Sequence, residues 1–156
     1  MKESRKPYSD RTDIEKLQSQ WWKLSGLHSR EEWSAAVVRA ATAAEIAANI
    51  AIRTEFQSIG TFAPGFVDSL LKWANGLSGK IDRLLLPISQ GSPRHDSIRQ
   101  LKATATSINK IRNAVAHSGD FCNETEAQTA IEQSKHFVES LIQLYEPQFK
   151  LIERGR

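Results

Sequence analysis

The chain has 156 residues and a mass of 17.5 kDa, which is the size of one ordinary domain. Hydrophobic residues make up 40% and charged residues 25%, so we expect one packed core, while the net charge of +3 is far from that of a histone-like protein. The single cysteine, Cys122, excludes an internal disulfide framework and a four-cysteine zinc site. No apolar run follows the basic residues at the start, and the longest low-charge stretch is too short to span a bilayer. We therefore expect a cytoplasmic protein with no membrane partner.

The chain is expected to form one helical domain over residues 12–150. Residues 1–11 and 151–156 are rich in lysine and arginine, and we expect them to be flexible basic tails. The apolar residues of 12–25 recur every three or four positions, which predicts a helix that stops at Ser25-Gly26. Ser29, with Glu32 three positions later, predicts a capping box at the start of an alanine-rich helix that runs to about Phe56.

Shorter elements are expected to follow this long helix. The apolar spacing predicts a helix over 66–73 and a short one over 80–86 that stops at Pro87, and then a loop over 87–97. Two more helices are expected at about 96–116 and 125–144. No alternating strand pattern occurs. The fold class predicted is all-α, an antiparallel helical bundle of four main helices plus one or two short ones.

The helix over 96–116 carries a cation within its apolar stripe. At 100° per residue, Arg112 lies about 40° from Ile108, well inside the stripe. A guanidinium cannot lose its proton, so its burial requires an anionic or carbonyl partner. Arg112 either pairs with a carboxylate such as Glu45, extends outward from the end of the bundle, or serves a functional site.

The residues after Arg112 form a recognisable motif. Arg112 to Gly119 reads Arg-Asn-Ala-Val-Ala-His-Ser-Gly, an R-x4-H arrangement at the end of an amphipathic helix. It resembles the signature of the HEPN superfamily, helical-bundle domains of prokaryotic toxin and defence systems and of eukaryotic RNA-processing proteins. The resemblance implies metal-independent RNA cleavage, in which the ribose 2′-hydroxyl attacks the adjacent phosphorus and leaves a 2′,3′-cyclic phosphate.

The chemistry of the motif residues suits this reaction. His117 has a reference pKa of about 6.5 and can act as general acid or base. The planar fork of Arg112 matches phosphate oxygens, and Asn113 can orient a neighbouring group without adding charge. Five positions separate Arg112 and His117 by about 140° on an ideal helix, so they share a face only if the helix unwinds near Ala116 or if two copies meet. The resemblance implies the second arrangement, a homodimer with the site at its interface.

A polar stripe on the alanine-rich helix is a second candidate. Glu45, Asn49 and Arg53 recur every four residues and form either a solvated face or the wall of a cleft opposite the motif. Lys110 and Ser118 are the remaining candidates for substrate binding or support of the site. No spacing typical of a metal site or a nucleotide-binding loop occurs, so we expect no metal and no cofactor.

The motif differs from one branch of the superfamily. HEPN toxins that are silenced by a nucleotidyltransferase antitoxin carry a tyrosine two places after the histidine, where this chain has Gly119. A toxin or antiviral role, with an antitoxin or regulatory partner protein, is the family-level expectation. The alternative is a non-catalytic HEPN-like regulator, similar to the mannitol operon repressor group, in which Arg112 is buried in a salt bridge and His117 caps carbonyls.

Charge is distributed unevenly around the motif. Residues 94–112 carry five basic side chains against one acidic side chain, whereas 113–149 carry one basic against six acidic. A basic helix bearing the motif, together with basic tails, favours a phosphate backbone as partner. This charge distribution is compatible with RNA, the substrate that the resemblance implies.

Overall fold

The computed structural model describes residues 12–29, 32–118 and 122–153. Helices account for most of these residues and no strand occurs among them, which confirms the all-α class. The four long helices are α1 (Asp13–Ser29), α2 (Trp33–Ile59), α7 (Lys102–Ser118) and α8 (Glu124–Gln143).

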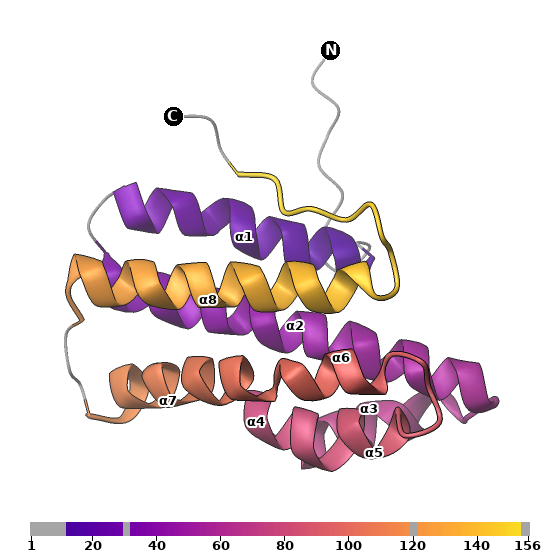
Figure 1. The fold of residues 1–156 in the computed structure, drawn as a ribbon. Coiled ribbons are helices and arrows are strands. Elements are labelled where there is room, and N and C mark those ends of the chain that lie inside the picture. The colour runs from indigo at the N-terminus through magenta and orange to yellow at the C-terminus, as the bar shows by residue number, and fades with distance from the viewer. Residues whose placement is uncertain (1–11, 30–31, 119–121, 154–156) are drawn as a thin grey trace.

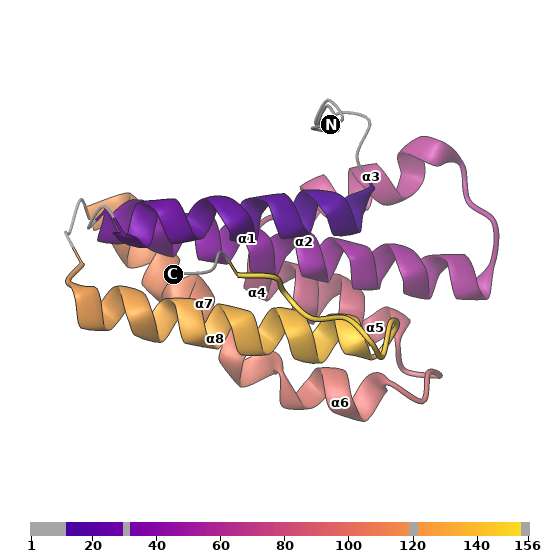
Figure 2. The same cartoon turned by 90° about the horizontal axis from the view of Figure 1, so that it is seen from above.

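Helix α2 is the central element and packs against α1, α8 and α7 (Figures 1 and 2). Its alanines explain this position, because small side chains let three neighbouring helices approach closely. Alanines 36, 40, 43, 44, 47, 48 and 51 are all fully buried. Phe137 and Leu141 of α8 and Leu17 of α1 are fully buried in the same core.

The same helix is long and apolar enough to cross a membrane by length and composition. Its most apolar window has a mean hydropathy of 1.4, and 56% of that window is buried inside the protein. Central packing against three helices accounts for this apolar character, since the core helix of a soluble protein has the same composition.

Five short elements lie between α2 and α7. They are α3 (Pro64–Trp73), α4 (Leu77–Lys80), a π-helical turn (Ile81–Leu85), α5 (Leu86–Ile88) and α6 (His95–Gln100). Pro64 stands in the first turn of α3, where its missing N–H is not needed. Gly76 adopts a φ of +82° between α3 and α4, a conformation that favours glycine.

The predicted stop of the first helix at Ser25-Gly26 is wrong. Helix α1 continues through Gly26 to Ser29, because Leu24 on one side of the glycine is buried and Leu27 on the other packs against the core. The cost of a glycine within a helix is about 1 kcal/mol, which this packing offsets. Ser29 therefore belongs to α1 and is not the N-cap of α2, whose N-cap residue is Glu32.

The predicted helix over 96–116 is divided in two. α6 ends at Gln100, Leu101 forms a turn, and α7 begins at Lys102. The apolar pattern runs through the break because Ile98, Leu101 and Ala105 all face the core. The preceding loop is shorter than predicted, since helical structure continues through Pro87 to Ile88 and resumes at His95.

The last helix matches its predicted bounds closely and carries a capping box that periodicity did not indicate. The Asn123 side chain accepts from the Glu126 N–H at 2.9 Å, and the Glu126 carboxylate accepts from the Asn123 N–H at 3.4 Å. Two of the N–H groups at the start of α8 thereby gain partners.

The predicted C-terminal tail begins later than residue 151. Leu151 is buried in the core, and its N–H donates to Glu139 Oε2 at 3.1 Å. The side-chain amide of Gln18 exchanges two hydrogen bonds with the backbone of Ile152, at 2.9 and 3.0 Å. Lys135 forms an ion pair with Glu153 at 2.9 Å, so contacts with the helices reach residue 153. The tail predicted at 1–11 and residues 154–156 lie outside the described residues.

Candidate functional site

The predicted catalytic residues lie in the last two turns of α7. His117 is exposed, and Arg112 and Asn113 are half-buried. Lys110, one turn before Asn113, is exposed. Arg112 lies at the edge of the buried stripe rather than at its centre, because Ile111 and Val115 beside it are themselves only half-buried. Ser118 is the last residue of α7, and Gly119 lies outside the described residues.

Arg112 is not neutralised by a carboxylate within the described part of the chain. Its Nη1 donates to Asn113 Oδ1 at 3.4 Å, and it forms no ion pair with Glu45. Adjacent helix positions normally diverge by about 100°, so this hydrogen bond directs the guanidinium toward the side of the helix that carries Asn113. The charge of Arg112 remains available to an anion.

One copy of α7 does not bring all three groups to one point. The helix continues to Ser118, so it does not unwind near Ala116 as one of the two predicted arrangements requires. Asn113 and His117 are four residues apart and share a face, with the Arg112 guanidinium linked to Asn113 at its margin. The result is a short polar surface of one amide, one imidazole and one guanidinium at the end of the helix.

The stripe of Glu45, Asn49 and Arg53 is half-buried on α2 and turns toward α3 and α4. Arg53 forms an ion pair with Asp68 of α3, and no hydrogen bond or ion pair joins the stripe to the three α7 residues within the described parts of the chain. Asn49 Oδ1 is buried and has no hydrogen-bond partner among the described residues. The structure thus places the stripe in a second polar region rather than beside the motif.

Lys80 belongs to this second region, and sequence reasoning missed it. Its side chain is buried, and its ammonium donates to the Leu71 carbonyl at 3.2 Å near the end of α3. Burial lowers the pKa of Lys80, the Glu45 carboxylate acts in the opposite direction, and Arg53 lowers it further. Lys80 is the last residue of a four-residue helix, which is too short to give a periodic signal that predicts its burial.

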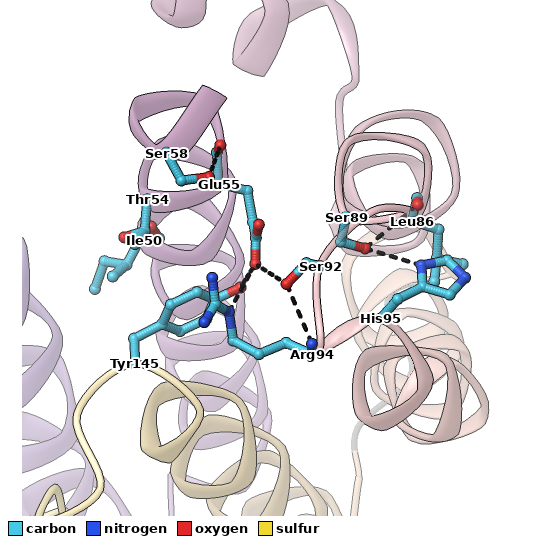
Figure 3. Close-up of polar contacts among 10 residues, drawn as sticks. All are labelled: Ile50, Thr54, Glu55, Ser58, Leu86, Ser89, Ser92, Arg94, His95 and Tyr145. Carbon is cyan, nitrogen blue, oxygen red and sulfur yellow. Dashed lines mark hydrogen bonds and ion pairs between the residues drawn. The ribbon is translucent and has the colours of Figure 1, made fainter. Parts of the chain in front are cut away.

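A third polar cluster surrounds Glu55, which is only 1% exposed (Figure 3). Its Oε1 accepts hydrogen bonds from Arg94 Nε at 2.9 Å, the Tyr145 hydroxyl at 2.8 Å and Ser92 Oγ at 3.4 Å. The Arg94 guanidinium also lies 4.8 Å from the centre of the Tyr145 ring. Three donors thus converge on one carboxylate oxygen of a residue that is shielded from solvent, and the cluster ties α2, the loop before α6 and the end of α8 together.

The same contacts hold the protons of this cluster in place. The hydrogen bond to Glu55 raises the pKa of Arg94, and burial with the same carboxylate raises the pKa of Tyr145 well above its ordinary value. Beside the cluster, Oγ of the buried Ser89 lies 3.1 Å from Nδ1 of His95. Glu55, Arg94 and Tyr145 are separated by 39 residues or more along the chain, so no local sequence pattern pairs them.

The described residues hold no group of three or more histidine, cysteine, aspartate or glutamate side chains that could bind a metal ion. The motif surface on α7 combines an imidazole, a guanidinium and a neutral amide, groups that can carry a proton and bind an anion. The family resemblance rests on these motif residues themselves. No family model matches the chain, and no curated protein or solved structure is significantly similar to it.

Proposed function

We propose that the chain is a metal-independent endoribonuclease of HEPN type, in which the four long helices form an antiparallel bundle and two copies assemble as a cytoplasmic homodimer. A single observation carries the proposal: Arg112, free of any carboxylate among the described residues, is hydrogen-bonded to Asn113 on the helix end that exposes His117. A toxin or antiviral effector is the biological role that the motif favours.

The reaction requires two proton transfers and stabilisation of one charged intermediate. A histidine acting as base takes the proton of the ribose 2′-hydroxyl, whose oxygen forms a new bond to the adjacent phosphorus. The bond from phosphorus to the 5′-oxygen of the next nucleotide breaks, and that oxygen accepts a proton from a histidine acting as acid. Arg112 binds the non-bridging oxygens while negative charge accumulates on them.

Two copies supply the two histidines that this scheme needs. In one copy, the exposed imidazole of His117 and the half-buried Arg112 leave the helix about 140° apart, and no second histidine belongs to the motif. If two α7 ends face each other, each His117 is presented to a groove that also contains the partner copy's motif. One imidazole then serves as base and the other as acid.

The remaining candidates differ in what they contribute to this proposal. Lys110 is exposed one turn before Asn113, on the face of α7 that also carries His117, and adds a cation to that face. Ser118 closes α7 next to His117. Glu45, Asn49 and Arg53 lie in the second polar region, apart from the motif contacts, so this scheme gives them no role.

The alternative, a non-catalytic regulator, requires an occluded motif. It places Arg112 in a buried salt bridge and uses His117 to cap carbonyls at the helix end. The exposure of His117 and the lack of an Arg112–Glu45 ion pair both favour the nuclease instead.

Incubation of the purified protein with RNA in the presence of EDTA tests the proposed chemistry. We expect cleavage to continue without divalent metal and to leave 2′,3′-cyclic phosphate ends, detected by their resistance to direct 3′-end ligation and by mass spectrometry. Products with plain 3′-hydroxyl ends, or cleavage that stops with EDTA, would show that a different mechanism operates.

A further inference from the structure

Helix α3 has apolar side chains that remain exposed to solvent as well as apolar side chains that are buried. Its inner positions include Leu71 and Ala74, which are 6% and 0% exposed. Phe66 and Trp73 lie on a second stripe, about 20° apart around the helix axis and roughly 100° or more from Leu71. Their side chains are 46% and 61% exposed. This second stripe of α3 therefore leaves much of its apolar surface exposed.

The turn that leads into α3 continues this apolar surface. Ile59, at the end of α2, is 60% exposed, and Phe62 is 39% exposed. The Phe62 ring stacks on Phe66 with centroids 5.5 Å apart, and both rings meet the edge or face of Phe56 beneath them. The α2–α3 turn forms one extremity of the protein (Figures 1 and 2), and residues 56–67 contain no charged side chain.

Positive charge lies beside this apolar surface, at the Trp73 end of α3. Two acidic side chains nearby are paired: Asp68 with Arg53, and Asp82 with Lys102 at 3.1 Å. Lys72 and Arg83 are exposed, and neither forms an ion pair with a carboxylate among the described residues. The Arg83 guanidinium lies 5.3 Å from the centre of the Trp73 ring. The exposed charges that remain around the tip are therefore cationic.

We propose that this surface, defined by Ile59, Phe62, Phe66 and Trp73, binds the interface of an anionic lipid bilayer. A protruding tip without charge can enter the boundary between headgroups and acyl chains without burying an ion. Trp73 stands between the apolar tip and the cations, as tryptophan does at membrane interfaces, and Lys72 and Arg83 remain level with the phosphates. This inference revises the sequence-based expectation of no membrane partner and is independent of the proposed nuclease activity.

Co-sedimentation of the full chain with vesicles tests the proposal, and the chain offers a matched control. Ile59 and Ile152 are both 60% exposed and lie on different parts of the surface. We expect binding to vesicles of phosphatidylcholine and phosphatidylserine, weakened about tenfold by Ile59→Ser because one apolar side chain no longer inserts. Ile152→Ser should bind as the unchanged protein does. Circular dichroism of both variants verifies that the helices are retained.

The charge component is tested with a second variant. Lys72→Gln combined with Arg83→Gln should lower binding to the phosphatidylserine vesicles and leave any binding to phosphatidylcholine alone unchanged. Absence of binding to either vesicle, or equal effects of Ile59→Ser and Ile152→Ser, would overturn the proposal. So would a folded Ile59→Ser variant that loses self-association while vesicle binding is unaffected, since the surface would then be a contact between copies.

Discussion

At the scale of single residues, the buried polar groups differ in how many hydrogen bonds they make. Glu55 accepts three hydrogen bonds from side chains of two distant segments. Asn49 Oδ1 has no hydrogen-bond partner among the described residues, and Lys80 donates to one carbonyl. Buried polar groups stabilise a fold only when their partners are in place, so substitutions at these positions should differ in effect.

Replacement of Glu55 by glutamine should destabilise the fold markedly. Glutamine keeps the volume but removes the negative charge that Arg94 and Tyr145 approach, so we expect the free energy of unfolding to fall by about 2 kcal/mol. Urea denaturation measures this change. Glu132→Gln, at an exposed position on α8, is the control and should change stability by no more than about 0.5 kcal/mol. Equal stability of the two variants would mean that the Glu55 cluster contributes nothing to the fold.

Lys80 should give stability a distinct pH dependence. Because burial lowers its pKa below the unfolded value, folding penalises the charged form. The unfolded chain holds more protons at this site between the two pKa values, so the Lys80 contribution to stability increases as pH rises through that window toward about 10.4.

Comparison with Lys80→Met isolates this contribution from other titrating groups. As the pH rises from 7 to about 10.4, the unfolding free energy of the unchanged protein should increase relative to that of Lys80→Met. Chemical denaturation at each pH measures the difference. A difference that stays constant across this range would show that the Lys80 pKa is the same in the folded and unfolded chain.

At the scale of elements, hydrophobic spacing predicted the long helices and missed what interrupts them. The stripe of α2 is buried where its alanines indicated, and α3 and α8 match their predicted ranges within two residues. The break at Leu101 was missed because the apolar side chains on both sides still face the core. Gly26 was taken as a stop because local propensity does not include the packing of Leu24 and Leu27.

The capping box of α8 should make a measurable contribution to stability. Asn123→Ala removes the acceptor of the Glu126 N–H, and we expect a loss of about 1 kcal/mol in unfolding free energy. Thermal unfolding monitored by circular dichroism detects such a change. Thr129→Ala on the exposed middle of the same helix should remain within about 0.5 kcal/mol of the unchanged protein. If both variants unfold alike, the box does not stabilise α8.

The candidate site was predictable where its residues lie on one helix. Residues on one helix, such as Arg112, Asn113 and His117, keep the relations that their spacing dictates. Contacts between helices do not follow from spacing, so the Glu55 cluster and the burial of Lys80 could not be predicted. The sequence alone could not decide whether Arg112 pairs with Glu45, because the two residues lie on different helices. In the structure they form no ion pair.

At the scale of the whole molecule, the surface features lie on separate elements. The motif is at the C-terminal end of α7, and the apolar tip is at the turn between α2 and α3 (Figure 1). The Glu55 cluster ties the end of α8 to α2, close to the side of the fold that carries α5 and α6 (Figure 3). The helical core thus separates the surface that we propose for RNA from the one that we propose for a lipid interface.

The most direct test of the central claim is the RNA-cleavage rate of His117→Ala, measured in EDTA beside His136→Ala. Both histidines are exposed, but only His117 belongs to the motif. Loss of a general acid–base group should lower the rate by about 10²- to 10⁴-fold in His117→Ala, whereas His136→Ala should cleave as the unchanged protein does. Cleavage by His117→Ala at the rate of the unchanged protein would contradict the assignment of catalysis to α7.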